Sequence, residues 1–189
     1  MSANNLVVAA YQGKKQAAVR LLDVNKIDAN SIGSGSWEGQ SALSVAAKRG
    51  HNDIVSLLLD RGADINTPDD VNGSALDVAV WSGHEKIIAM LLGRGADVNI
   101  PGDHYGSALG VAAWSGHDEI VAMLLDWGAD VNIRGGEYGS ALGAAAWSGY
   151  TKIVSMLLDQ GADVSIAGGK YGTPLIAAAH NATSMFWGS

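Results

Sequence analysis

The chain has 189 residues, of which 48% are hydrophobic, 19 are acidic and 12 are Lys or Arg, and it contains no cysteine. The formal net charge of −7 argues against a nucleic-acid partner, because clustered basic charge supplies most of the affinity for phosphates. No apolar run approaches the roughly 18 residues of a membrane span, and the first residues lack the basic segment of a secretory signal. These features predict an intracellular protein, of the cytoplasm or nucleus, without a membrane partner.

The first part of the chain predicts a degenerate capping unit at residues 1–30. Apolar residues recur through 6–22, and the lysines among them would form a solvated outer face. Residues 24–40 are irregular, and the glycine–serine run at 33–36 predicts a flexible loop. Trp37 at its end needs a surface to rest on. The glycine spacing in this loop fits neither phosphate-binding fingerprint, so we expect no nucleotide site there.

The stretch from Tyr105 to His117 organises the rest of the chain. It recurs 33 residues later at 138–150, and looser copies lie at 73–84 and 171–175. A fixed period of this size indicates a stacked array in which each unit covers an apolar face of its neighbour. Regular units are expected at 36–68, 69–101, 102–134 and 135–167, followed by a partial unit at 168–189.

Each unit predicts two helices and a hairpin. In one copy, Ser107 is a good helix N-cap, and 108–114 form a short Ala-rich helix that Gly116 ends in a left-handed C-cap. The second helix, 118–127, carries large aliphatic residues on one face at helical spacing. These aliphatic residues are Ile120, Val121, Leu124 and Leu125.

The segment 50–66 reads Gly-His-x-x-Ile-Val-x-Leu-Leu-Leu-x-x-Gly-Ala-Asp-Ile-Asn and has near copies at 83–99, 116–132 and 149–165. On these residues the chain resembles the ankyrin repeat family. The resemblance covers nearly the whole chain and implies an all-α fold. This fold is an α-solenoid of stacked helix–turn–helix–hairpin repeats, with about five repeats and a truncated C-terminal one. We expect residues 1–189 to form a single ankyrin-repeat domain.

The last unit departs from the family pattern. Thr-Pro-Leu-His survives there as Thr-Pro-Leu at 173–175, with Ile176 in the place of the histidine. Aligned by the period, the chain ends about one turn into an outer helix. The apolar residues 185–187 would then plug the end of the stack or lie disordered. An alternative is that the chain was cut inside a longer array.

In an ankyrin array, the hairpin tips and first helices line a concave groove, and the resemblance implies that partners bind there. The position before the Ser-Gly or Arg-Gly turn faces this groove. Along the chain it is occupied by Tyr11, Lys48, Trp81, Trp114, Trp147 and His180. Three successive tryptophans at one exposed position predict an aromatic binding surface. The alternative is that the tryptophans were simply copied when the repeats were duplicated.

The helix position four residues before each tryptophan indicates what lies beneath the indoles. It is occupied by Ser44, Asp77, Gly110, Gly143 and Ile176. Helical side chains lean toward the N-terminus, so each indole should lie over this position. Glycine inside a helix costs roughly 1 kcal/mol relative to alanine, and Gly110 and Gly143 therefore predict a shaped floor for an indole or a ligand. The alternative is that the tryptophans stack on each other and serve only packing.

The hairpin tips add a second aromatic column, formed by Tyr105, Tyr138 and Tyr171. These tyrosines either brace the hairpins or contact a partner. The tips also carry candidate contact residues outside the repeat framework, namely His104, Glu137 and Lys170. The histidines of the Gly-His turns have no metal-ligand spacing and indicate a structural role.

Two functions follow from these features. The first is a non-catalytic protein-binding scaffold whose aromatic concave groove holds a partner protein. The second is a small-molecule-binding protein or an unusual enzyme that encloses an apolar ligand in the Trp-lined groove. Asp77, His104 and Glu137 could supply acid–base groups, with the pKa of Asp77 raised by burial against an indole. No nucleophile elbow, metal motif or cofactor fingerprint accompanies them, so the sequence favours the scaffold, with no cofactor and no metal.

Overall fold

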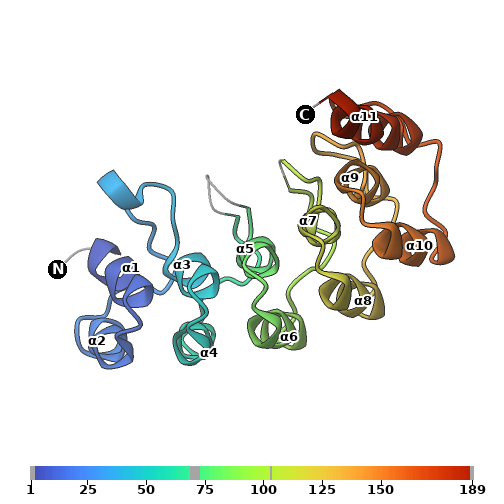
Figure 1. The fold of residues 1–189 in the computed structure, drawn as a ribbon. Helices are drawn as coiled ribbons and strands as arrows, with labels where there is room; N and C mark the ends of the chain where they lie inside the picture. The colour runs from blue at the N-terminus through green and yellow to red at the C-terminus, as the bar shows by residue number, and fades with distance from the viewer. Residues whose placement is uncertain (1–2, 69–72, 103, 188–189) are drawn as a thin grey trace. The chain divides into compact units, whose positions relative to one another are not determined.

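The computed structural model describes residues 3–68, 73–102 and 104–187, the last seven of these by their backbone alone. The chain divides into two compact units, residues 1–97 and 98–189, and each is described by itself. In the described ranges, the regular secondary structure consists of helices, apart from isolated β-bridges (Figure 1). This confirms the predicted all-α fold. Among these helices, none combines the length and the apolar character that a bilayer crossing needs.

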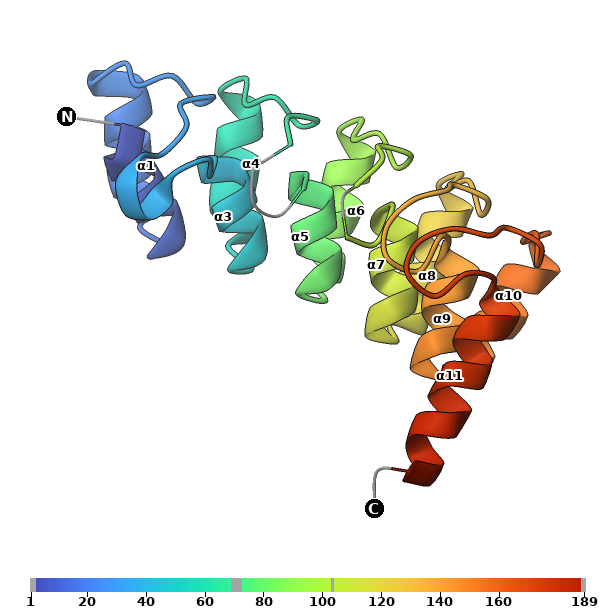
Figure 2. The same ribbon diagram turned by 90° about the horizontal axis from the view of Figure 1, so that it is seen from above.

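The first unit has two layers of helices. The inner layer contains α1 (Ala3–Tyr11), α3 (Ala42–Lys48) and α5 (Ala75–Trp81). The outer layer contains α2 (Lys15–Val19) with its π-helical extension (Arg20–Val24), α4 (Asn52–Asp60) and α6 (Glu85–Gly93). Each inner helix packs on the next inner helix and on the outer helix of its own repeat (Figures 1 and 2).

The second unit repeats this arrangement. Its inner helices are α7 (Ala108–Ser115), α9 (Ala141–Ser148) and α11 (Pro174–Trp187). Its outer helices are α8 (Asp118–Asp126) and α10 (Thr151–Asp159). Helix α9 packs between α7 and α11, so its two sides are both covered.

The predicted capping signals set the helix boundaries. The Ser107 hydroxyl accepts a hydrogen bond from the backbone N–H of Gly110 at 3.1 Å, and Ser140 does the same for Gly143. Gly116 ends α7 in the left-handed conformation, at a φ of 78°. Helix α8 ends one residue earlier than predicted. Of its predicted core residues, Ile120, Val121 and Leu124 are buried and Leu125 is half-buried.

Asparagines at the end of each repeat join neighbouring repeats within each unit. The Asn30 side chain accepts a hydrogen bond from the backbone N–H of Asp64 at 2.7 Å and donates to the Gly62 carbonyl at 3.1 Å. Asn132 does the same in the second unit, with the N–H of Asp163 and the carbonyl of Gly161. The asparagine side chain thereby satisfies backbone N–H and C=O groups in the turn that follows an outer helix. These groups lie outside the regular hydrogen bonds of the helix and need another partner.

The irregular segment 24–40, predicted as a flexible loop, ends in a hairpin. The hairpin is closed by a bridge between Ile32 and Ser41. The backbone N–H of Ser34 donates to the Asn4 side chain at 2.7 Å, and this bond pins the hairpin to α1. Trp37 rests on the Tyr11 ring, with 5.1 Å between the ring centroids.

Helix α11 corrects the prediction that an outer helix begins near the end of the chain. It is one continuous helix of 14 residues, and Figure 2 shows it running past the end of α9. Glycines end α7 and α9 at Gly116 and Gly149, but the corresponding residue is Ala182. Alanine is a strong helix former and disfavours the left-handed cap, so the helix continues. The side chains of 185–187 lie outside the described residues.

Candidate functional site

The aromatic residues predicted in the second unit form one cluster, here called the aromatic cluster. It contains Tyr105, Tyr138 and Tyr171 from the hairpin tips, Trp114 and Trp147 from α7 and α9, and His180 from α11. The three tyrosines are stacked along the unit. Their ring centroids are 6.2 Å apart between Tyr105 and Tyr138, and 5.4 Å apart between Tyr138 and Tyr171.

The two indoles of the cluster pack against these tyrosines. The Trp114 ring lies 5.0 Å from the Tyr105 ring, and its Nε1–H donates a hydrogen bond to the Tyr138 hydroxyl at 2.9 Å. Trp147 stacks on Tyr171 with 4.1 Å between centroids and lies 6.1 Å from the His180 ring. Each indole is therefore held by a hairpin tip, and the tips and inner helices form one surface.

Gly110 and Gly143 do not form an open floor beneath the indoles, which corrects the sequence-based expectation. A methyl group on Gly110 would collide with the carbonyl oxygen of Tyr105, and one on Gly143 would collide with that of Tyr138. The space is thus filled by the backbone of the preceding hairpin tip. These glycines permit a close approach of the backbone to the helix.

Backbone hydrogen bonds between consecutive tips explain why the tyrosines stack. The N–H of Glu137 donates to the carbonyl of His104 at 2.8 Å, and the N–H of Lys170 donates to the carbonyl of Glu137 at 2.6 Å. Bonds of this kind hold adjacent chains about 4.8 Å apart, which brings side chains at equivalent positions into contact. Sequence analysis missed this ladder, although the 33-residue spacing of 104, 137 and 170 was visible.

The predicted contact residues at the tips are exposed. His104 Nδ1 lies 3.8 Å from Glu137 Oε1, and the Lys170 Nζ atom lies 5.4 Å from the centre of the Tyr171 ring. Exposed charges of this kind contribute little to stability. These side chains determine which charges surround the aromatic cluster.

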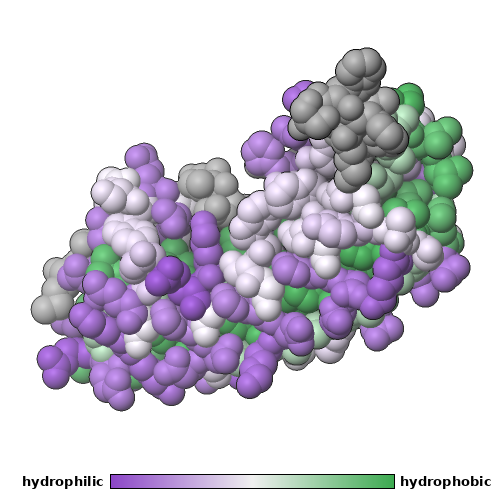
Figure 3. All heavy atoms as spheres, in the orientation of Figure 1, coloured by the Kyte–Doolittle hydropathy of each residue, from purple (hydrophilic) through white to green (hydrophobic). Residues whose placement is uncertain are grey.

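The aromatic cluster is half-buried, and its two tryptophans lie on uncharged helices. Tyr138 is buried, and the other rings of the second-unit hairpin tips and indoles are partly exposed. Burial raises the pKa of Tyr105 and Tyr138 above the ordinary value of a phenol. Helices α7 and α9 contain no Asp, Glu, Lys or Arg. In Figure 3, pale spheres of intermediate hydropathy gather over the region of these two helices.

In the first unit, Trp81 is 44% exposed at the end of α5, whereas Asp77 on the same helix is buried. One Asp77 carboxylate oxygen accepts hydrogen bonds from the Ser74 N–H at 2.7 Å and the Ser74 hydroxyl at 2.8 Å. The Ser74 hydroxyl in turn accepts from the Asp77 N–H, which completes a capping box. Asp77 therefore acts as a structural cap of α5.

The buried Asp77 carboxyl gives a testable pH dependence. Its pKa is raised, chiefly because burial disfavours the charged form, although the Ser74 bonds oppose this effect. A raised pKa means that the folded state binds the proton more tightly. We therefore expect the stability contributed by this group to be full below its unfolded pKa and to fall as pH rises through its folded pKa. Measured from pH 3.5 to 7, the Tm of the wild type should fall relative to that of Asp77→Asn. A constant difference would contradict the raised pKa.

The three acid–base candidates do not form one group within either unit. Asp77 belongs to the first unit, and His104 and Glu137 belong to the second, where both are exposed. Within the described ranges, no three His, Asp or Glu side chains converge on a position for a metal ion.

His51 and His84 of the Gly-His turns have the expected structural role. His51 Nε2 lies 3.2 Å from the Tyr11 carbonyl oxygen, and its ring packs on Gly13. His84 repeats both contacts one repeat later, with Lys48 and Gly50. Each ring therefore joins the turns of adjacent repeats.

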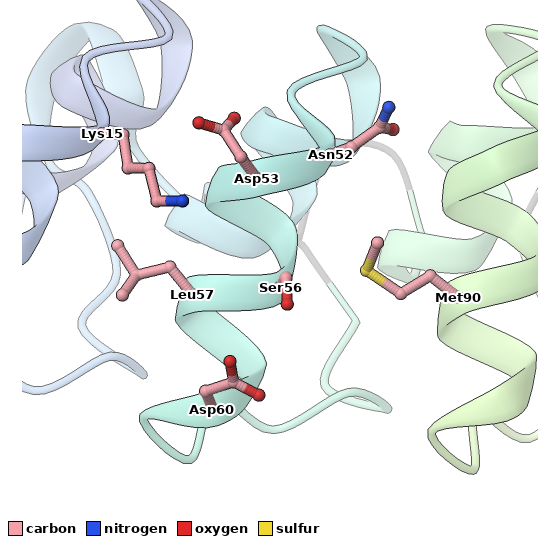
Figure 4. A pocket seen from close by; sticks show the side chains of 7 residues that line it. All are labelled: Lys15, Asn52, Asp53, Ser56, Leu57, Asp60 and Met90. Carbon is pink, nitrogen blue, oxygen red and sulfur yellow. The ribbon is translucent and has the colours of Figure 1, made fainter.

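An open depression of about 410 Å³ lies on the outer layer of the first unit (Figure 4). It is lined by Lys15 of α2, Met90 of α6 and five residues of α4. Figure 4 shows the Asp53 and Asp60 carboxylates at opposite ends of α4. The polar groups of a ligand site converge on one place, and those of this depression do not. The aromatic cluster is therefore the better candidate.

Comparison with known proteins agrees with the repeat architecture. The family described as "Ankyrin repeats (3 copies)" matches residues 6–102 and 109–186. A 66-residue stretch is 44% identical to part of the E3 ubiquitin-protein ligase XBAT33 of Arabidopsis thaliana. That match covers 35% of this chain and 12% of the relative's length. The helices, caps and family match together show that the chain belongs to the ankyrin repeat family.

Proposed function

We propose that the chain is a non-catalytic protein-binding scaffold and that a partner protein contacts the aromatic cluster of the second unit. The observation that supports this proposal is that Trp114 and Trp147, partly exposed on helices without charged residues, pack against the tyrosines of the hairpin tips. Tyrosine and tryptophan are enriched at protein interfaces, and charged residues are depleted from interface cores.

The cluster is also held in place before any partner binds. Trp114 is fixed by its hydrogen bond to Tyr138, and Trp147 by its stacking on Tyr171. The tips that carry the tyrosines are joined through their backbones. A surface that is already ordered loses little conformational entropy on binding, which favours affinity.

The matched relative supports a binding role in a limited way. Its name describes a ubiquitin ligase, but the chain spans only about an eighth of its length. The likeness therefore lies in the repeats, and it supports a recognition module without extending ligase chemistry to this chain. The filled space at Gly110 and Gly143 gives no support to an enclosed small molecule.

The proposal predicts that Trp147 is a binding hot spot. Peptides selected from a displayed library against the whole chain would be synthesised, and their affinities measured by calorimetry. Trp147→Ala should weaken binding by about 30-fold, equivalent to roughly 2 kcal/mol, because buried interface tryptophans carry much of the binding energy.

Trp127→Ala is the matched control. Trp127 is 51% exposed in the same unit, but it follows the outer helix α8, away from the cluster. We expect its replacement to change the affinity less than about twofold. Unchanged affinity in Trp147→Ala, or a larger loss in Trp127→Ala, would reject the aromatic cluster as the binding surface.

A further inference from the structure

The inner helices of the first unit expose positive charge, although the chain has a net charge of −7. Helices α1, α3 and α5 contain two charged residues between them, Lys48 and Asp77. Asp77 is buried, whereas Lys48 is exposed at the end of α3, and Arg49 directly after it is also exposed. The outer helix α4 instead exposes Asp53 and Asp60. The inner and outer helices of this unit therefore differ in the sign of their charge.

Arg49 lies on a pair of aromatic rings. Its guanidinium is placed over the Tyr11 ring, with 4.6 Å between the Cζ atom and the ring centre. Trp37 packs edge-on against the same ring. A hydrogen bond to the Asn4 side chain of α1 pins the hairpin that carries Trp37. Three parts of the chain thus meet at one place, and we call the following residues the basic face: Tyr11, Trp37, Lys48 and Arg49.

Arg49 differs in its contacts from two other arginines of the unit. Arg61 pairs with Asp23, with 2.8 Å between Nε and Oδ1. Arg94 pairs with Asp60 at 2.9 Å. Arg49 contacts a tyrosine ring, which attracts a guanidinium through its face but does not neutralise its charge. A guanidinium stacked in this way keeps N–H donors along its edge, and these match the two oxygens of a carboxylate.

We propose that the basic face binds an acidic segment of a partner protein, with an Asp or Glu side chain of that segment on the Arg49 guanidinium. Charge complementarity indicates this occupant, because complementary charges fix the register and the choice of a partner. Glu38, exposed beside Trp37 in the hairpin, leaves the two positive charges in excess. Tyr11, 41% exposed, and the half-buried Trp37 supply apolar area beside the guanidinium. An ion pair that is partly covered by such rings is less screened by salt.

A subtractive peptide selection tests this inference, which rests on the scaffold role proposed above but concerns a separate surface. A displayed library of random peptides is bound to the whole wild-type chain, and peptides that also bind Arg49→Gln are removed. The remaining peptides should be enriched in Asp and Glu relative to the library. The matched control subtracts with Arg20→Gln, which removes one exposed positive charge from the outer layer of the same unit. This subtraction should leave no such enriched set, because Arg20 lies outside the basic face.

Calorimetry with one enriched peptide locates the contact. Arg49→Gln should weaken binding by about 10-fold or more, because hydrogen bonds between charged groups are lost. Arg20→Gln should change the affinity less than about twofold. Replacing the acidic residue of the peptide by its amide should weaken binding to the wild type but have little effect on Arg49→Gln, as a direct pair requires. Both arginines are exposed, so the variants should fold, and circular dichroism would verify this.

Trp147→Ala separates this inference from the proposed function. It should leave the affinity of the enriched peptide unchanged, because Trp147 belongs to the second unit. A loss of affinity in that variant would assign the peptide to the aromatic cluster and overturn the basic face as its site. A subtraction that leaves no peptides, or peptides without an excess of Asp and Glu, would also overturn the proposal. So would equal losses in Arg49→Gln and Arg20→Gln, because net charge alone would then explain the binding.

Discussion

Replacing Leu109 with alanine is expected to lower the free energy of unfolding of the second unit by about 2–5 kcal/mol. Leu109 is 1% exposed on α7, and α9 packs on that helix. Truncating the side chain removes its burial energy and leaves a cavity that close-packed helices fill only in part. Urea unfolding followed by circular dichroism measures the loss.

Leu175→Ala is the control for this prediction, because it has the same register in another repeat. Leu175 is 79% exposed, so its truncation should change stability by less than about 0.5 kcal/mol. Damage in a linear array spreads mainly to neighbouring repeats. Hydrogen exchange should therefore increase in α7 and α9 while α1 and α3 remain protected. A shift below about 1 kcal/mol in Leu109→Ala would mean that the wrong face has been placed inside.

The inner helices could be predicted closely because local residues determine their ends. The serine before each helix and the glycine after it act within one turn, so their effect is visible in the sequence. Ser107 and Gly116 both have the predicted roles. The 33-residue period then fixed which helices are neighbours, because an array repeats the same contact.

The arrangement of the aromatic cluster could not be predicted, because it depends on the conformation of the tips. Ser107 and Ser140, which precede the helices with Gly110 and Gly143, have φ angles of −171° and −164°. Ser74, whose helix carries Asp77, has a φ of −75°. The repeat with Asp77 at the third helical position has one backbone conformation before the helix. The repeats with glycine at that position have another. Residue spacing carries no information about this choice.

The continuation of α11 has a signal in the sequence. Ala182 stands where the preceding repeats have Gly116 and Gly149, so the left-handed cap is absent. The 33-residue period alone predicts that the helix ends at this position. The residue that ends a helix is better evidence than the register of the repeat.

Gly110→Ala distinguishes the effect of helix propensity from that of the close backbone contact, because the two predict opposite changes in stability. Helix propensity alone predicts that alanine stabilises α7 by about 1 kcal/mol. The structure predicts a net loss of about 1–3 kcal/mol, because the new methyl group collides with the Tyr105 carbonyl and must displace the hairpin tip. The displaced tip should also disturb the contact between Tyr105 and Trp114, which tryptophan fluorescence would report.

Gly93→Ala provides the control, because a methyl group there meets no atom within 4 Å. Gly93 is the last residue of α6 and is exposed, so propensity acts without a steric conflict. We expect alanine to stabilise the first unit by up to about 1 kcal/mol. If both substitutions were stabilising, the close approach of the Tyr105 carbonyl to α7 would be wrong, and the space beneath the aromatic cluster would be open after all. A loss at Gly110 combined with a gain at Gly93 would instead show that backbone contact explains why a helix interior carries glycine there.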